Sequence, residues 1–451
     1  MSVSKILGGS LVAVLLAQPA SAESIRSALA SAYDSNPELN AQRAATRAND
    51  ENLPQAQAGY RPTISANASA GLRQSDSNIG GVTNTTPYGY GIQISQALFS
   101  GFRTVNSVQA AKAGIRASRE TLRNVEQNVL LNTAIAYANV LQSGELVSIR
   151  KQSLAFLREQ VRSSQARLDV GEGTRTDLEQ SRAQLSRAQA QLQAAQAQLQ
   201  ASRANYRQLT GREPTNLKWP SGPARLYPRS QSQGIAIAMA EHPAIRASQH
   251  LVDAQAFNVK VAEGALLPTV TLNGGANKSF NQTTQGSRNS SVEATVNVQV
   301  PIYQGGAEYS AVRQGKQTLG EQRILVDQAR DQVRAQVVSA WTQLQAARAN
   351  LDANRAQVRA ARLALEGVVE ERNVGQRTQL DVLNSQTTLL QAQELLLNAR
   401  RDRVIAGYQL VAAIGRLNSR RLNLQVAHYS PKEHAKQVED RWFGLRTPSG
   451  R

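Results

Sequence analysis

The sequence predicts an α+β membrane protein in which each chain combines four amphipathic β-strands with very long helices. Three observations support this fold class: an export signal at the start, a tandem duplication over most of the remainder, and strands of membrane-spanning length beside helices without proline. Only 4% of the 451 residues are aromatic, whereas a globular core relies on aromatic side chains for buried area. The chain has no cysteine, which excludes disulfides, thiolate zinc sites and a lipidated cysteine anchor.

Residues 1–22 have the features of a secretory signal peptide. Lys5 supplies the positive start, residues 6–17 are apolar, and residues 20–22 form a small-residue cleavage site, so we expect the mature chain to begin at Glu23. An apolar stretch of about 12 residues is shorter than the ~20 needed to span a bilayer, which disfavours an anchoring helix. Removal of Lys5 lowers the net charge from +18 to +17.

Most of the chain is a tandem duplication. Early motifs recur 206 residues later and subsequent motifs recur after 204 residues, so the copies differ by one loop-sized change. We expect repeat 1 at residues 23–212, a proline-rich linker at 213–230, repeat 2 at 231–416, and a C-terminal tail at 417–451. The matching motifs are Asn36-Pro37 with His242-Pro243, Pro62-Thr63 with Pro268-Thr269, Ser100-Gly101 with Gln304-Gly305, Val170-Gly171 with Val374-Gly375, Asp177 with Asp381, and Gly211-Arg212 with Gly415-Arg416.

After an initial helix, each repeat contains two predicted strands in which apolar and polar residues alternate. The four strands are expected at about residues 62–72, 87–99, 268–280 and 291–303. Their length of roughly 10 to 12 residues is that of a tilted membrane-spanning β-strand. Phe99 and Tyr303 close the second strand of each repeat, where an aromatic residue at the membrane interface is expected. The strands alone would also fit a soluble β-sandwich.

Long helices complete each repeat. Residues 103–168 contain no proline and predict one helix of about 66 residues, or ~100 Å. Residues 174–210 form a shorter returning helix, which would match the long one if laid end to end with residues 234–261. Between residues 178 and 206 an apolar residue recurs at every seventh position, with small residues three positions further on, as in heptad packing. The many polar residues outside this seam predict a helical wall wetted on both faces.

Four strands are too few to close a membrane barrel within one chain. The smallest barrels have about eight strands, and an open sheet edge in lipid leaves backbone groups without hydrogen bonds. If the strands span a membrane, several chains must therefore combine them.

The motifs resemble those of the TolC family of outer-membrane efflux channels, over about residues 24–417. The resemblance implies a trimer with a twelve-stranded outer-membrane β-barrel, four strands per chain, continued by a long periplasmic α-helical coiled-coil barrel. The motifs that carry it are the strand exits Leu98-Phe99-Ser100-Gly101 and Pro301-Ile302-Tyr303-Gln304-Gly305-Gly306, and the helical turns at residues 170–177 and 374–383. The tail sequences Tyr429-Ser430-Pro431 and Arg441-Trp442-Phe443-Gly444 look similar to those of the alphaproteobacterial branch.

The same resemblance implies a function and partners. The protein would be the outer-membrane exit duct of tripartite efflux pumps or type I secretion systems, located in the outer membrane of a Gram-negative bacterium and extending into the periplasm. It would be passive, without cofactors. Its partners would be a periplasmic adaptor (membrane fusion) protein, an inner-membrane RND, ABC or MFS transporter, and outer-membrane lipid.

By motif, Asp177, Arg377 and Asp381 would form the periplasmic gate, and the turns at Gly171 and Gly375 would contact the adaptor. The sequence departs from the family pattern at Asn384, where a second acidic residue is common, and at Arg372, where an aromatic link can sit. These departures predict a less acidic entrance. Alternatively, Arg377 and Asp381 form an ordinary i,i+4 pair on a solvated helix.

Three other functions fit the sequence less well. An enzyme is disfavoured because the four histidines lack metal-binding spacing, and neither Gly171-Glu172-Gly173 nor Gly315-Lys316 completes a nucleotide-binding motif. The positive charge would suit a coiled-coil protein that binds nucleic acid or anionic lipid, but export argues against nucleic acid and the charges are spread over both repeats. A periplasmic adaptor would lack four membrane-length strands and the duplication.

Overall fold

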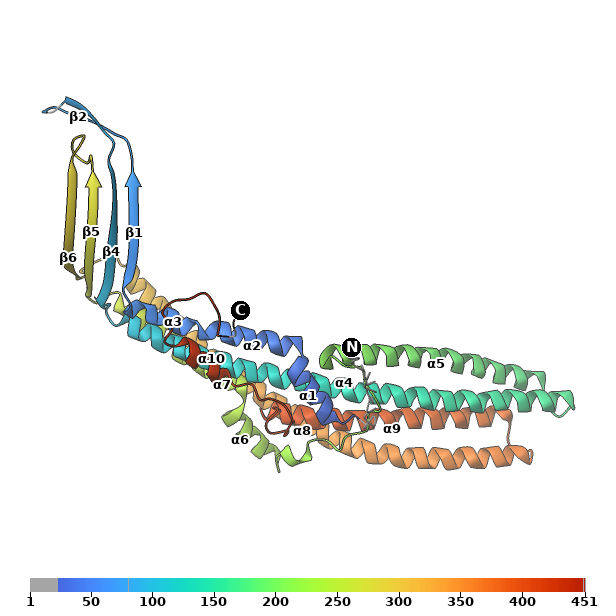
Figure 1. Ribbon diagram of the computed structural model, residues 1–451. Coiled ribbons are helices and arrows are strands. Elements are labelled where there is room, and N and C mark those ends of the chain that lie inside the picture. The colour runs from blue at the N-terminus through green and yellow to red at the C-terminus, as the bar shows by residue number, and fades with distance from the viewer. Residues whose placement is uncertain (1–22, 80, 449, 451) are drawn as a thin grey trace, which may run out of the picture. The chain divides into compact units, whose positions relative to one another are not determined.

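The computed structural model describes residues 23–79, 81–448 and 450, so the expected signal peptide lies outside the described residues. Long helices alternate with strands along the chain, which divides into two compact units (Figure 1). The elements are α1 (Ile25–Ser35), α2 (Pro37–Asp50), α3 (Asn52–Gln57), η1 (Ala58–Tyr60), β1 (Thr63–Ala70), β2 (Arg73–Ser77), β3 (Gly81–Thr85), β4 (Tyr88–Phe99), α4 (Arg103–Asp169), α5 (Arg175–Thr210), η2 (Ala224–Leu226), α6 (Gln231–Glu241), α7 (Pro243–Gly264), β5 (Thr269–Phe280), β6 (Arg288–Gln299), α8 (Ala307–Asn373), α9 (Gln379–Ala413) and α10 (Pro431–Val438).

Unit 1 contains residues 23–36, 132–224 and 345–408, and its core is formed between long helices. One apolar cluster joins Leu154 and Leu157 of α4 to Leu192 of α5 and Leu383 of α9. Leu185 and Leu199, which lie one heptad on either side of Leu192, pack against the same cluster. Each fully buried leucine contributes about 1.5–3 kcal/mol. The heptad seam of the sequence is therefore a packing seam of α5.

Unit 2 contains residues 37–131, 225–344 and 409–451 and includes the sheet. Its four long strands are antiparallel in the order β1-β4-β5-β6, so the β4–β5 pair joins the two repeats (Figure 1). Thr63 lies opposite Ser95, and their repeat equivalents Thr269 and Gln299 lie opposite each other. The two hairpins therefore share one register, as the duplication requires.

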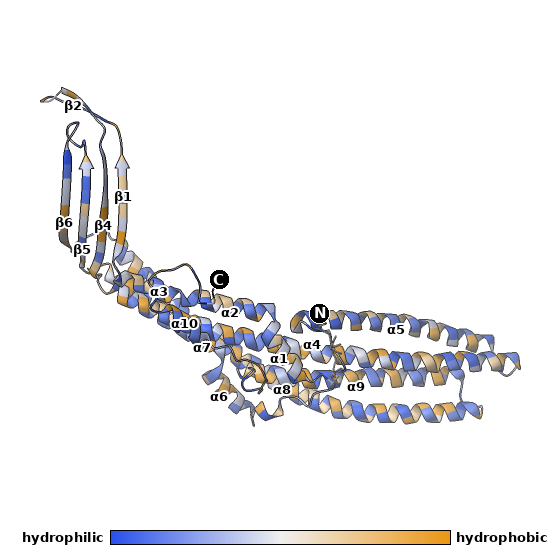
Figure 2. Ribbon diagram, in the orientation of Figure 1, coloured by the Kyte–Doolittle hydropathy of each residue, from blue (hydrophilic) through white to orange (hydrophobic). Residues whose placement is uncertain are grey.

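The strand pairing places apolar residues on one face of the sheet and polar residues on the other. Across the polar face, Ser95 donates its hydroxyl to Asn273 Oδ1 at 2.8 Å. On the apolar face large side chains are exposed, since Ile64 is 68% and Val292 88% accessible. The apolar face carries Ile64, Ala66, Ile92, Ile94, Leu272, Ala276, Val292, Val296 and Val298. In Figure 2 the ends of β5 and β6 far from the helices are hydrophilic.

Three features differ from the expected elements. The connector between β1 and β4 forms a separate two-stranded ribbon, β2–β3, in addition to the four expected strands. β6 spans Arg288–Gln299, three to four residues earlier than expected, so Tyr303 lies beyond the strand. The helical segment expected at 234–261 is interrupted at His242, because Pro243 lacks an N–H and begins a new helix, α7.

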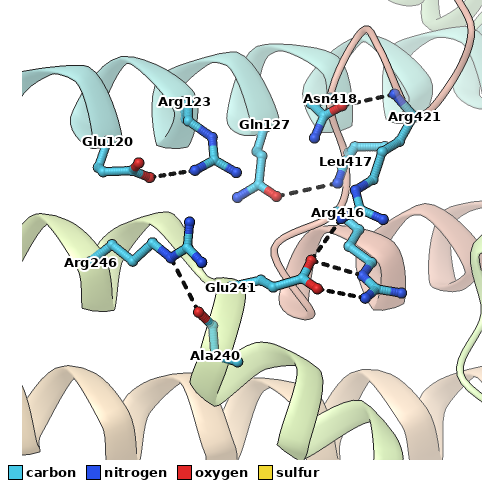
Figure 3. Close-up of polar contacts among 10 residues, drawn as sticks. All are labelled: Glu120, Arg123, Gln127, Ala240, Glu241, Arg246, Arg416, Leu417, Asn418 and Arg421. Carbon is cyan, nitrogen blue, oxygen red and sulfur yellow. Dashed lines mark hydrogen bonds and ion pairs between the residues drawn. The ribbon is translucent and has the colours of Figure 1, made fainter.

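The break before Pro243 forms a polar joint with the end of α9 in unit 2 (Figure 3). Glu241 accepts two hydrogen bonds from Arg416, at 2.7 and 3.1 Å, and one from Arg421 at 2.8 Å. These bonds, led by those of Arg416, lower the pKa of Glu241. Gln127 of α4 accepts a hydrogen bond from the N–H of Leu417 at 3.3 Å.

Repeat 1 has an equivalent joint within unit 1, made with neutral groups. The Ser35 hydroxyl donates to Thr210 O at 3.0 Å, and the Asn36 amide donates to Leu209 O at 3.1 Å. In both repeats, therefore, the residues before the proline bind the end of the returning helix. This contact explains why the Asn36-Pro37 and Gly211-Arg212 motifs recur together in the duplication.

We expect His242 to make the protein sensitive to acid. It is 5% exposed and its Nδ1 accepts a hydrogen bond from Ala244 N at 3.2 Å; burial, together with the positive charge of Arg123, lowers its pKa to about 4. The unfolded chain, with a pKa near ~6.5, binds this proton more readily, so stability falls as pH decreases from about 6.5 to about 4. The full loss is about 3 kcal/mol, measurable by denaturant unfolding at neutral and acidic pH.

The matched control is His242→Asn, because asparagine caps helices well and is the residue that repeat 1 has at Asn36. This variant should lose less stability than the native chain over the same pH range. Equal losses in both proteins would show that His242 is not the responsible group.

Candidate functional site

Both helical hairpins of unit 1 end in turns built on one plan. Gly171 follows α4 with φ of +78°, and Gly375 follows α8 with φ of +82°. After each glycine, the next N–H donates to a carbonyl of the preceding helix at 2.8 Å, which closes the helix end. The left-handed backbone reverses the chain within five residues in each turn.

The two predicted gate aspartates begin the helices that follow these turns. Asp177 Oδ2 accepts hydrogen bonds from the hydroxyl of Thr174 at 2.7 Å and from its N–H at 3.3 Å. Asp381 Oδ2 accepts the same two bonds from Thr378, at 2.8 and 3.0 Å. The Thr378 N–H is the main cause that lowers the pKa of Asp381. Each carboxylate is thus fixed by a capping box through Oδ2, and its Oδ1 makes no hydrogen bond within the described residues.

Arg377 pairs with a residue that the sequence did not single out. Its Nε donates to Glu371 Oε2 at 2.8 Å, across the turn, and not to Asp381 four residues later. This hydrogen bond and the charge of Glu371 are the main causes that raise the pKa of Arg377, and the charge of Asp381 adds to them. Among the described residues, no hydrogen bond or ion pair connects Arg377 to Asp177 of the other hairpin. Both η nitrogens of Arg377 remain available as donors.

Arg372 lies buried beneath the second turn, at 7% exposure. Its Nη1 contacts Gln379 Oε1 at 3.3 Å and Ser163 Oγ at 3.5 Å, and Gln379 in turn donates to Gln160 at 3.1 Å. Burial, and then the charge of Arg167, lowers the pKa of Arg372. The Arg372 side chain thus joins α8 and α9 to α4 through uncharged partners. Asn384, the other departure from the family pattern, is exposed on α9.

Unit 2 has aromatic side chains at both ends of its sheet. Phe99 lies opposite Val270 after a register shift, and its ring packs edge-on against Phe102 at 5.1 Å. At the other end Tyr88 stacks on Phe280 at 4.6 Å. Tyr303, beyond β6, is 75% exposed.

Across the described ranges, no three or more His, Asp or Glu side chains gather as metal ligands. None of the described helices combines the length and the apolar character needed to cross a membrane.

Comparisons with known proteins agree on one family. The family model of the outer membrane efflux protein matches residues 28–212 and 234–416. The chain is 46% identical to outer membrane efflux protein BepC of Brucella suis, covering 97% of this chain and 95% of BepC. It is 26% identical to outer membrane protein TolC of Escherichia coli, covering 89% and 84%.

The fold is shared with a solved channel. The Campylobacter jejuni CmeC outer membrane channel superposes with a TM-score of 0.78 at 18% identity, covering 92% of this chain and 89% of CmeC. The predicted fold class is thereby confirmed. Since the family model covers both repeats, this chain belongs to the outer membrane efflux protein family.

Proposed function

We propose that the protein works as a homotrimer whose twelve strands close one barrel in the outer membrane. As a member of its family it is an outer-membrane exit duct for efflux or secretion. In the proposed assembly, substrates pass without chemical change from an inner-membrane RND, ABC or MFS transporter, through a periplasmic adaptor contact, to the exterior.

The observation that supports the trimer is that β1 and β6, at the two edges of the sheet, each lack a second partner strand in the described part of the chain. Such edges in lipid would each leave a row of backbone groups without hydrogen bonds. The β4–β5 pair joins repeat 1 to repeat 2, so the duplication supplies an equivalent pair, β6 with β1 of the next subunit. Within the chain Ile94 lies opposite Gly274. The equivalent contact places Val298 opposite Ala68 of the partner subunit.

This register keeps both faces of the sheet continuous. Ala68 and Val298 belong to the apolar face of their own strands, so pairing them continues the apolar face around the barrel. The aromatic residues Tyr88 and Phe99 are eleven positions apart on β4, about 36 Å along a strand. At a tilt of about 45° this gives an apolar band about 25 Å high, which is the height found in outer-membrane barrels.

A cysteine pair tests the assembly, because the chain has no native cysteine. Ala68→Cys combined with Val298→Cys should give a covalent trimer on mild oxidation, since directly opposite Cβ atoms lie about 4.5–5.5 Å apart. The control pair, Ala68→Cys with Ala294→Cys, is displaced by four residues on the same face and should remain monomeric. Monomer from both pairs, or equal crosslinking of both, would contradict the proposed register.

The gate belongs to the same proposal. Asp177, Arg377 and Asp381 sit at the turns of the two hairpins, with fixed carboxylates and free guanidinium donors. In a trimer these groups would link neighbouring hairpins and hold the periplasmic end closed. The exposed turns at Gly171 and Gly375 would be the contacts for the adaptor, and Phe99 and Tyr303 would lie at the periplasmic membrane interface.

A further inference from the structure

The C-terminal tail folds back along the helices of unit 2 and is held there by a contact between His434 and Asp50. α10 packs on α2, and His434 Nδ1 lies 3.2 Å from Asp50 Oδ2. Asp50 is 1% exposed and also pairs with Arg119 of α4 at 3.6 Å. A buried carboxylate with two partners fixes the course of the tail at this point.

Beyond α10 the tail reaches the start of the sheet. The Arg61 guanidinium lies over the Trp442 ring at 4.8 Å and donates a hydrogen bond to Arg441 O. Arg61 is two residues before β1, so Trp442 lies at the end of the sheet that adjoins the helices. Tyr60, beside it, is a 53% exposed aromatic residue whose carbonyl accepts a hydrogen bond from Gln96 of β4.

The tail presents large apolar side chains to solvent at this place. Trp442 is 64%, Phe443 93% and Leu445 103% exposed. Three such side chains within four residues form an apolar patch of the kind that marks a binding surface, whereas single exposed residues are ordinary. Tryptophan in particular favours the boundary between lipid and water.

A positively charged cleft lies beside the same segment. The cleft has a volume of about 250 Å³ between α3, α4 and α10, with Ile115 in its lining. Five cations line it, Lys112, Arg116 and Arg119 from α4 and Lys432 and Lys436 from α10, against one acid, Glu439. Arg119 pairs with Asp50, whereas the other four form no ion pair with another described residue. The cleft is therefore suited to an anion that also carries an apolar part.

We propose that residues 431–446, the tail segment, bind the periplasmic leaflet of the outer membrane around the barrel. Trp442, Phe443 and Leu445 enter the interface, and the cations of the cleft hold the phosphate of an anionic phospholipid. The patch is continuous with the membrane-spanning sheet through Arg61 and β1, and its charge complements an anionic lipid. Both features favour a lipid surface over a second protein, because binding of a protein would not require the patch to lie beside the end of β1.

Tryptophan fluorescence tests the position of the tail in the full-length mature protein. The chain has three tryptophans, so Trp219→Phe with Trp341→Phe leaves Trp442 as the only emitter. After reconstitution into vesicles of phosphatidylcholine and phosphatidylglycerol, lipids brominated in the upper acyl chain should quench Trp442 strongly. The control keeps Trp341 alone, roughly 50 Å along α8 from its first residue, and should not be quenched.

Vesicle flotation separates failure of the tail proposal from failure of membrane insertion. If the protein floats with the vesicles but Trp442 is not quenched, the tail proposal is wrong while the outer-membrane function stands. A blue shift of Trp442 emission when trimers form in lipid-free detergent, without quenching in vesicles, would assign the patch to a neighbouring copy and also overturn the proposal.

A charge variant tests the phosphate site. With Trp442 as the only emitter, brominated phosphatidylglycerol should quench more than brominated phosphatidylcholine. Lys432→Gln with Lys436→Gln should reduce this preference by about fivefold per charge removed. The control, Arg359→Gln with Arg362→Gln, removes the same charge from exposed positions on α8 and should leave it unchanged. Loss of the preference on adding inorganic phosphate at constant ionic strength would assign the cleft to free phosphate instead.

Discussion

Arg377→Ala is expected to raise the conductance of the protein in planar lipid bilayers, by holding the periplasmic end open. In the chain, Arg377 uses only Nε, in its bond to Glu371, and both η nitrogens are free to bind a neighbouring hairpin. Asp177 and Asp381 are fixed by their capping boxes, so their carboxylate oxygens are well placed to accept such links. Removal of the guanidinium deletes every link that it makes.

Symmetry makes the expected effect large. One exposed ion pair changes an equilibrium by no more than about fivefold. Three equivalent links in a trimer would multiply to roughly a hundredfold, enough to convert a mostly closed channel into a mostly open one. A network of weak exposed links also suits a gate, because contact with an adaptor can reverse it.

The matched control is Arg362→Ala, which removes one exposed arginine from α8, the helix before the turn, at a position away from the turn. It should conduct like the native protein. If Arg377→Ala also conducts like the native protein, Arg377 only stabilises its own turn through Glu371, and the gate must lie elsewhere. If both variants conduct more, a general effect of net charge on ion flow explains the result.

The sequence predicts elements whose signal repeats along the chain. Apolar and polar residues alternate from Val292 onward, and apolar residues recur at every seventh position around Leu192. Each pattern repeats several times along one face, so together they predict β6 and the packing seam of α5. The duplication adds a second copy of each signal, and it also predicts the shared register seen at Thr63 and Thr269. The sequence also predicts a closed barrel made by several chains, because an open sheet edge in lipid would leave backbone groups without hydrogen bonds.

Features that depend on one contact could not be predicted in this way. The partner of Arg377 is Glu371 because a left-handed turn brings two residues six apart together, whereas helix periodicity suggests a spacing of four. Arg372 would be expected at the surface, yet packing of α4 against α9 buries it. The tail reaches Asp50 from 384 residues away, and no local pattern contains that information.

Gly101→Ala is expected to have the largest effect on stability among the glycine substitutions considered. Gly101 connects β4 to α4 with φ of +61°, and an added Cβ would overlap the carbonyl oxygen of Gly264 and lie 3.0 Å from Leu267 Cβ. The left-handed backbone costs about 1–2 kcal/mol for alanine, and the overlap with another backbone costs a further 1–3 kcal/mol or so. A total of roughly 2–5 kcal/mol is a large part of a typical folding stability of about 5–15 kcal/mol.

Thermal unfolding in detergent measures this loss, with Gly286→Ala as the control. Gly286 has φ of +88° but nothing within 4 Å of an added Cβ, so only the backbone strain applies. Equal losses in both variants would show that the contact with Gly264 is unimportant.

Gly305→Ala then distinguishes packing within one chain from packing between subunits. Gly305 is the repeat equivalent of Gly101, has φ of +71°, and has no atom of a described residue, beyond its chain neighbours, within 4 Å of an added Cβ. In an isolated chain it should therefore behave like Gly286. In a closed trimer the duplication places the first repeat of the neighbouring subunit where Gly264 contacts Gly101, so Gly305→Ala should also lower the yield of trimer. A normal trimer yield would mean that the two junctions, although related by duplication, do not pack alike.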